Sequence, residues 1–328
     1  MKIPILIIVY TRPETTIQVF NSLKKVKAET IYVYQGIPNA KKNTEDYKNY
    51  LKVEKIIKDI DWDCKVKIKK KKGVSSYDAW KLAVNWFFKN EEEGIILEDD
   101  VVPNKSFFLF CSKLLKKYRN NKNIAQICGT SFVNQGNITN ESYFFSNYSI
   151  GWGWATWRRS IIDFDEKMKD WPKLKKNKTF KNIINDEKFL YYWSKVFDKQ
   201  YKNISKAWDE RWLYSNWKNN KLSIIPKKHL VKNIGFGKKA LHTKNKQWYS
   251  DLETQEINFI NKHPKKILVN RKYDNWLNNH VYGVKFHYLK EKFLKNKILK
   301  SKPVYSLIRI VFIRIIKPIF RVLKPFKI

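Results

Sequence analysis

Three consecutive carboxylates, Glu98, Asp99 and Asp100, follow the apolar run 94–97 in the stretch GIILEDDVVPNKSFF. Adjacent acids repel one another and stay ionised near neutral pH only where positive charge compensates them. Mn²⁺ and Mg²⁺ bind a few carboxylate oxygens together with phosphate oxygens. We therefore interpret the cluster as a site for a divalent cation and a diphosphate. The alternative is a solvated turn neutralised by nearby lysines.

Alternating strands and helices place these acids at the end of a strand. The apolar pattern predicts strands over 3–10, 30–36, 63–73, 94–100 and 124–132, with helices over 11–26, 42–60, 75–90 and 106–118 between them. This order predicts an α/β fold with a mainly parallel central sheet flanked by helices. Ligands bind at the carboxyl ends of such strands, where Thr11-Arg12 and Gln35-Gly36 also fall.

The bulk composition is typical of a folded, strongly basic protein. The chain has 328 residues, a formal net charge of +37, and 43% hydrophobic residues. That size suits one large or two moderate domains. Cys64, Cys111 and Cys128 are too scattered for a metal motif and favour a reduced, cytoplasmic compartment. The apolar run 5–9 is too short for a signal peptide, and no stretch of about 20 apolar residues predicts a membrane-spanning helix.

Five motifs resemble those of a known enzyme family. LIIVYTRPE, GIILEDDVVPNKSFFLFC, GWGWATWRR, WDERW and NIGFGKKALHT, in this order, resemble bacterial glycosyltransferases of the GT-A fold, the family 2-like kind often labelled the hemolysin-like HlpA group. They are also similar to the eukaryotic N-acetylglucosaminyltransferase I group. The resemblance covers residues 1–280. It implies a GT-A glycosyltransferase domain with a nucleotide-binding half, 1–132, and an acceptor half, 133–280.

The resemblance implies roles for the residues at the ends of the first and fourth expected strands. EDD stands for the DxD signature of this fold. Asp100 would coordinate Mn²⁺ or Mg²⁺, Asp99 would contact the ribose or the metal shell, and Glu98 would contact the nucleotide or the sugar. Thr11 and Arg12 would line the nucleotide pocket.

Two further positions are implied by the same resemblance. Gln35 stands where related sequences often carry an acid that faces the nucleobase, so it would bind the nucleotide in a different way. His242, in ALHTK, would be a second metal ligand, with a purely structural histidine as the alternative.

Asp209 and Glu210 are the candidates for a general base. An acceptor hydroxyl that attacks an anomeric carbon with inversion needs a base, usually a carboxylate. AWDERW offers Asp209 first and Glu210 second, beside Trp208 and Trp212. The alternative is a helix start at which the two tryptophans pack as core.

The motif GWGWATWRR, 151–159, would form the floor for the donor sugar and the acceptor. Its glycines let the backbone approach a ligand closely, and Trp152, Gly153 and Trp154 would line the nucleotide-sugar. Arg158 or Arg159 would pair with phosphate. The alternative is an aromatic core strand with a bulge.

The segment 281–328 predicts a basic amphipathic helical tail. From residue 264 to the end, 17 Lys and Arg stand against two acids. Basic residues from 309 onward fall on one face of a helical wheel, with Ile, Val, Leu and Phe on the rest. This pattern is typical of a helix that lies on an anionic membrane. An amphipathic helix packed on the main domain is the alternative.

Together these features predict a metal-dependent glycosyltransferase, peripheral on the inner face of the cell membrane. It would move a hexose or N-acetylhexosamine from a nucleotide-sugar, a UDP-sugar in preference, to a cell-surface glycan such as lipopolysaccharide or capsule, or to a lipid-linked precursor. The alternative is a nucleotidyltransferase that acts on a sugar phosphate, but the expected glycine-rich loop is missing after the first strand. Nucleic-acid binding explains the charge but not three acids at a strand end.

Overall fold

The computed structural model describes residues 1–41, 43–133, 138–236, 248–257 and 260–295. The chain forms two units, which are described separately here. The first comprises Met1–Asn134, Thr139–Glu166 and Lys206–Val269, and the second comprises Gln135–Ile138, Lys167–Ser205 and Asn270–Ile328. All the described candidate site residues lie in the first unit.

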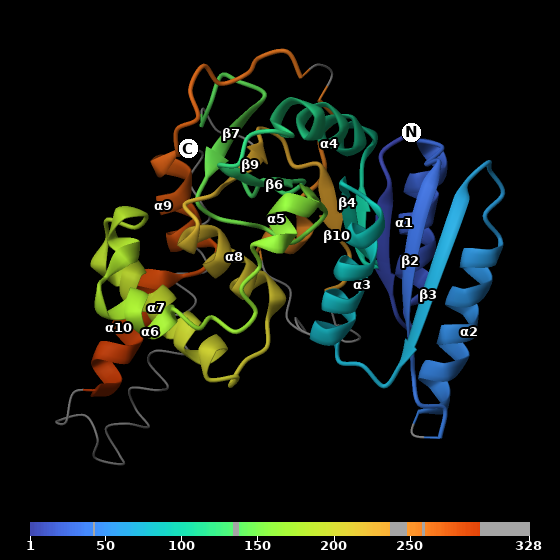
Figure 1. The fold of residues 1–328 in the computed structure, drawn as a ribbon, viewed down its shortest axis with the longest axis horizontal. Helices are drawn as coiled ribbons and strands as arrows, with labels where there is room; N and C mark the ends of the chain where they lie inside the picture. Colours follow the sequence, from blue (N-terminus) through green and yellow to red (C-terminus); the bar gives the residue numbers. More distant parts are fainter. Residues whose placement is uncertain (42, 134–137, 237–247, 258–259, 296–328) are drawn as a thin grey trace. The chain divides into compact units, whose positions relative to one another are not determined.

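The first unit contains one large sheet and a small one (Figure 1). The large sheet has eight strands in the order β3-β2-β1-β4-β8-β6-β9-β7, and β10 pairs with β5 in the small sheet. The bounds are β1 Ile5–Val9, β2 Thr30–Ile37, β3 Lys65–Lys72, β4 Glu93–Glu98, β5 Val101–Pro103, β6 Ile124–Cys128, β7 Tyr143–Ser146, β8 Trp154–Trp157, β9 Leu222–Pro226 and β10 Val231–Asn233.

Strands β3, β2, β1 and β4 run parallel to one another. Beyond β4 the sheet is mixed, because β8 is antiparallel to both β4 and β6 while β9 is parallel to β6. Strand β1 is entirely apolar, and β4 has the apolar run 94–97 between two glutamates, as expected of strands that are covered on both faces. The parallel part brings the ends of β1, β2 and β4 to the same edge.

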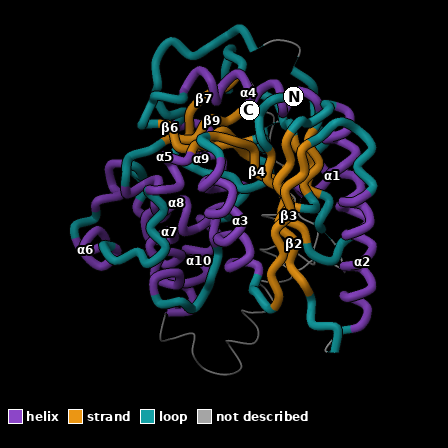
Figure 2. Tube along the Cα trace, turned by 45° about the vertical axis from the view of Figure 1, so that its right-hand side comes forward, coloured by secondary structure: helices purple, strands orange, loops and turns teal. Residues whose placement is uncertain are grey.

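Helices cover both faces of this sheet. The bounds in the first unit are α1 Pro13–Lys25, α2 Thr44–Lys58, α3 Ser76–Asn90, α4 Lys105–Tyr118, α5 Arg158–Ile162, α8 Trp208–Lys218 and the short η2 Trp248–Asp251. One core joins α1, α2 and α4 to one face of the sheet, and a second joins α3 and α8 to the other. Figure 2 shows α1 and α2 on one side of β2 and β3 and α3 on the other.

Local sequence fixes where these helices begin. Asn43, Ser75 and Asn104 each accept a hydrogen bond from a backbone N–H in the first turn of α2, α3 and α4 respectively. Helix α1 begins with Pro13, whose fixed φ suits the first turn. These start signals are why the order of elements expected over residues 1–132 agrees with the structure.

Strand β3 is an edge strand with the sequence KVKIKKKK. It pairs with β2 along its whole length, from Thr30↔Lys65 to Ile37↔Lys72. The ammonium group of Lys67 lies over the Tyr32 ring, 4.3 Å from its centroid, and Lys70 forms an ion pair with Glu54. The other lysines of β3 are exposed to solvent.

The second unit is helical where it is described. Its elements are α6 Trp171–Lys176, η1 Thr179–Asn182, α7 Glu187–Tyr201, α9 Arg271–His280 and α10 Val284–Lys295. Trp171 packs edge-on against Phe197, with ring centroids 5.4 Å apart. The indole N–H of Trp193 donates to Asn278 Oδ1 at 2.9 Å, which ties α7 to α9. An aromatic core therefore holds these helices together.

Candidate active site

Asp99 and Asp100 are held by the loop that follows β1. Parallel pairing of β1 with β4 places the end of one strand beside the end of the other. Arg12 donates from one terminal nitrogen to Asp100 Oδ2 at 2.6 Å and from the other to Asp99 Oδ1. The Tyr10 N–H donates to Asp99 Oδ2 at 3.1 Å. Both oxygens of Asp99 are thus occupied, and its side chain is almost fully buried.

Asp100 is different, because one of its oxygens has no partner. Oδ1 of Asp100 is buried and accepts no hydrogen bond from any described residue. The Ile234 N–H donates to the Asp100 carbonyl at 2.8 Å, which brings the chain after β10 against the carboxylate. A Cβ atom on Gly235 would lie 1.9 Å from Asp100 Oδ2, so only glycine fits there.

The charges of these groups shift one another's titration. Burial, with the negative charges of Asp100 and Asp99, raises the pKa of Glu98 to about 8, although Arg12 opposes this. Burial also raises the pKa of Asp99 to about 6, against the lowering effect of Arg12. Burial by itself would lower the pKa of Arg12, but the two aspartates raise it above its ordinary value. Arg12 is the counter-ion of the cluster.

Asp209 belongs to the same electrostatic neighbourhood. It lies in the first turn of α8, is exposed, and contributes to the raised pKa of Glu98. Glu210, the next residue, lies in the same turn and is partly buried. The helix start that the sequence suggests is therefore present, and Asp209 also comes near the strand-end acids.

Trp208 is clamped between two other tryptophans. Its ring stacks on Trp80 with centroids 4.5 Å apart and an interplanar angle of 9°, and on Trp154 at 5.6 Å and 18°. A Cβ atom on Gly151 would lie 2.6 Å from the Trp208 ring. These two stacked rings hold Trp208 and so fix the N-terminus of α8, next to Asp209.

The GWGW motif divides between core and surface. Trp154 is 1% exposed and belongs to β8, whose four residues are all buried, as the core-strand alternative predicts. Gly153 has a φ of +57°, which favours glycine. Trp152 is partly exposed and packs against Phe132 and Tyr249, with ring centroids 5.4 Å and 5.7 Å away.

Thr11 and Gln35 lie at the same edge of the sheet but differ in exposure. Thr11 is partly exposed in the turn between β1 and α1. Gln35 is completely buried in β2, and its side-chain amide donates to the Tyr50 carbonyl at 3.4 Å. Its Oε1 has no hydrogen-bond partner among the described residues.

The residues fit a metal that is held only in part by protein. Within the described ranges, no group of three or more His, Cys, Asp or Glu side chains is arranged to hold a metal ion. The unpartnered, buried Oδ1 of Asp100 is nevertheless a suitable single ligand, with phosphate oxygens as the others. His242 lies outside the described residues.

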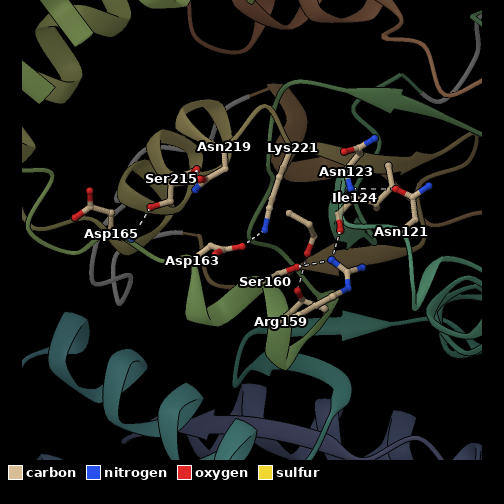
Figure 3. Close-up of polar contacts among 12 residues, drawn as sticks. Asn121, Asn123, Ile124, Arg159, Ser160, Asp163, Asp165, Ser215, Asn219 and Lys221 are labelled. Carbon is tan, nitrogen blue, oxygen red and sulfur yellow. Dashed lines mark hydrogen bonds and ion pairs between the residues drawn. The ribbon is translucent and has the colours of Figure 1, made fainter. Parts of the chain in front are cut away.

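The two arginines that end the GWGWATWRR motif contact neighbouring loops of the chain. Arg159 donates to the carbonyls of Arg119 at 2.9 Å and Ile124 at 2.8 Å, beyond the end of α4 (Figure 3). Arg158 forms an ion pair with Glu92 at 2.5 Å. These contacts fasten the segment after β8 to neighbouring loops.

Three contacts fasten the far end of α8, and Figure 3 shows two of them, Asp165 with Ser215 and Lys221 with Asp163. Lys218 pairs with Asp165 at 2.9 Å, and the Asp165 N–H donates to Ser215 Oγ at 2.9 Å. Lys221, just beyond the helix, pairs with Asp163. Helix α8 is thus held at its C-terminal end by charge and at its N-terminal end by the tryptophan stack.

Sequence reasoning missed three residues that shape the site. Tyr10 and Ile234 act through backbone N–H groups, so their side-chain types carry no signal. Gly235 is in the motif NIGFG, which pointed to a family resemblance but not to contact with Asp100. The free thiols Cys64, Cys111 and Cys128 form no part of the site.

The expected tail lies largely outside the description, since residues 296–328 are not described. In the remainder of the chain, no helix is both long enough and apolar enough to cross a membrane.

Comparisons with known proteins add little. No family model and no curated protein matches the sequence. Among solved structures, the apo-form glycosyltransferase GlyE of Streptococcus pneumoniae TIGR4 is similar with a TM-score of 0.27 and 10% sequence identity, over 68% of this chain. The match spans 45% of that protein's length. A likeness of this size does not identify the activity of this chain.

Proposed function

We propose that this chain is a GT-A type, inverting glycosyltransferase that uses a nucleotide-sugar donor and a divalent cation. The observation that carries the proposal is the pairing of Arg12 with Asp99 and Asp100 at the carboxyl ends of the parallel strands. There Oδ1 of Asp100 is buried and has no hydrogen-bond partner among the described residues. This edge is where α/β sheets bind nucleotides. The order of motifs along residues 1–280 supports the same function.

Asp100 is the proposed protein ligand of Mn²⁺ or Mg²⁺, and His242 the proposed second one. When bound, the cation would neutralise the negative charge that develops on the departing nucleoside diphosphate. Arg12 is the proposed protein cation that would bind the same phosphates, because its planar guanidinium group suits phosphate oxygens. Glu98, Asp99, Thr11 and Gln35 are the proposed contacts of the nucleotide-sugar.

Asp209 is the proposed general base. Its carboxylate would accept the proton of an acceptor hydroxyl while that oxygen bonds to the anomeric carbon. The bond from that carbon to the diphosphate oxygen then breaks, and the leaving oxygen keeps the electron pair. Asp209 is exposed to solvent and lies close enough to the strand-end acids for its charge to affect Glu98, which supports this role. Glu210 is the second choice for this role.

Trp152 remains the proposed aromatic contact for the sugar. It is partly exposed, whereas Trp154 offers no free face because β8 and its neighbours bury it. The proposed acceptor is a cell-surface glycan or a lipid-linked precursor, and the tail 281–328 is proposed to hold the enzyme on an anionic membrane surface.

Nucleotidyl transfer is less well supported. The loop between β1 and α1 is short, has no glycine, and uses Arg12 to hold two carboxylates. A nucleotidyltransferase needs a loop that wraps a triphosphate there.

A panel of nucleotide-sugars, UDP-sugars first, tests the function by the release of nucleoside diphosphate in the presence of MnCl₂. We expect turnover that EDTA abolishes. Asp100→Asn keeps the size of the side chain but removes its charge, and should lower kcat/KM by about 100-fold or more. The matched control is Asp59→Asn, at an exposed position after α2, which should leave turnover unchanged. Full turnover in EDTA, or by Asp100→Asn, would overturn the metal-dependent mechanism.

A further inference from the structure

Arg12 fills the position that a cation would take beside Asp99 and Asp100. Its two terminal nitrogens each hold a different aspartate, at 2.6 Å for Asp100 Oδ2. Its Nε is buried and has no hydrogen-bond partner among the described residues. One positive charge is thus shared between two carboxylates, and a divalent cation that approaches this pair meets a positive charge already in place.

Access to Asp100 is also restricted by packing. The residue is 8% exposed, Gly235 lies directly against Oδ2, and the free Oδ1 is out of contact with solvent. A cation with its hydration shell cannot reach Oδ1 unless a neighbour moves. Arg12 is the neighbour suited to move, because its side chain is 22% exposed and therefore reaches the surface.

A diphosphate offers Arg12 an alternative set of hydrogen-bond acceptors. The guanidinium fork binds phosphate oxygens with the same paired geometry as carboxylate oxygens. If Arg12 turns from the aspartates to a diphosphate, the Asp99–Asp100 pair loses its counter-ion at the moment when phosphate oxygens arrive as further metal ligands. Both changes favour a divalent cation at Asp100 Oδ1.

We propose that Arg12 serves as the resident counter-ion of Asp99 and Asp100, so that a divalent cation and a nucleoside diphosphate bind together and not independently. The inference rests on the proposed nucleotide-sugar site. Arg12 is a positioning residue here: it exchanges carboxylate partners for phosphate partners and thereby couples the two ligands. Since coupling is reciprocal, each ligand should raise the affinity of the other by the same factor.

The test measures free Mn²⁺ by electron paramagnetic resonance during titration of the full chain, with MnCl₂ alone and with MnCl₂ plus UDP. For the wild type we expect UDP to tighten Mn²⁺ binding by about tenfold or more. Arg12→Gln should bind Mn²⁺ alone at least about fivefold more tightly than wild type, and UDP should add much less. The matched control is Arg119→Gln, which removes an arginine paired to Glu93 at the opposite end of β4 and should behave as wild type.

Two outcomes would overturn the inference: equal Mn²⁺ affinity with and without UDP in the wild type, or no gain in Mn²⁺ affinity in Arg12→Gln. Asp100→Asn should abolish the binding in either background, which locates the site. If Arg12→Gln does not fold without metal, Arg12→Lys replaces it. A lysine keeps the charge but cannot hold both carboxylates at once, so Mn²⁺ alone should still bind more tightly than to wild type.

The binding readout separates this inference from the proposed function. Coupled binding of Mn²⁺ and UDP without sugar transfer would sink the proposed function and leave the exchange standing. Sugar transfer together with independent binding of Mn²⁺ and UDP would support the proposed function and overturn the exchange by Arg12.

Discussion

Glu98 is the acid of the cluster that makes no ion pair or hydrogen bond with a described residue. Asp99 and Asp100 share Arg12, whereas Glu98 interacts with its neighbours only through their charge. Burial and two adjacent negative charges favour its protonated form, which is why its pKa rises to about 8. The environment of Glu98 therefore favours the protonated form over the ionised one.

The raised pKa of Glu98 should make the stability of the fold depend on pH. The pKa of Glu98 is about 8 in the folded chain against an ordinary 4.5, so the folded state holds a proton that the unfolded state has released between these two values. Stability should therefore fall as pH rises through this window. Glu98→Gln, which cannot ionise, should remove on the order of 2 kcal/mol of that fall.

The measurement is urea unfolding with EDTA present, at several pH values between 5 and 8.5. The matched control is Glu45→Gln, at an exposed position in the first turn of α2, and its pH profile should follow the wild type. Parallel profiles for wild type and Glu98→Gln would show that Glu98 titrates normally.

At the scale of elements, helix α8 owes its placement to a tryptophan stack at one end and ion pairs at the other. Trp208 is held on both faces, and Gly151 leaves the room that its ring needs. A glycine is required there for space and not for backbone conformation, because its φ is not in the left-handed region. The direction of Asp209 thus depends on a residue in a different part of the sequence.

Gly151→Ala should push the Trp208 ring out of the stack. We expect a loss of about 1–3 kcal/mol in unfolding free energy, from overpacking. If Asp209 is the base, kcat should fall about tenfold or more while the KM for the donor changes little. Thermal unfolding and steady-state kinetics check both effects.

A second substitution shows whether the effect passes through Trp208. Trp208→Phe removes the ring atoms that meet the new methyl group, so the double variant Gly151→Ala/Trp208→Phe should lose less stability than the two single losses added together. Strict additivity would show that the methyl group meets something other than Trp208.

The elements that the sequence predicts well are those with strong local signals. Strands β1 and β4 are continuous apolar runs, and α2, α3 and α4 start at Asn or Ser caps, so their presence and order are readable from sequence. The strand expected at 94–100 is predicted two residues too long. It ends at Glu98, because Asp99 and Asp100 leave it to pair with Arg12.

The remaining parts depend on contacts between distant residues. β5 and β10 are three residues each and exist because they pair with each other. The partnership of Arg12 with the two aspartates, 87 and 88 residues away, and the sandwich around Trp208 leave no local pattern. Sequence reasoning could name the acids of the site but not the cation that holds them.

For the whole molecule, the charge of +37 is the property that the site does not explain. Residues 296–328 hold a dense share of it and are the basis of the proposed membrane contact. The prediction is that sedimentation with anionic liposomes depends on these charges. Six basic residues should be changed to Gln together: Arg309, Arg314, Lys317, Arg321, Lys324 and Lys327.

This variant should lose at least about tenfold in affinity for vesicles rich in phosphatidylserine, since each basic residue near such a surface contributes on the order of 1 kcal/mol. The control changes six exposed lysines of the second unit to Gln and so has the same net charge: Lys169, Lys173, Lys176, Lys178, Lys188 and Lys202. Equal loss in both variants would mean that total charge, and not the tail, drives the binding.

Strand β3 carries six lysines and so holds another part of the positive charge. It forms one side of the large sheet, and the backbone groups along its outer side pair with no described strand. Such a side is a template on which a second copy of the chain could add its own strand. A second β3 placed there would set its six lysines against six lysines, and like charges at that spacing repel strongly. The lysines of β3 therefore disfavour edge-to-edge pairing of two copies along this side of the sheet.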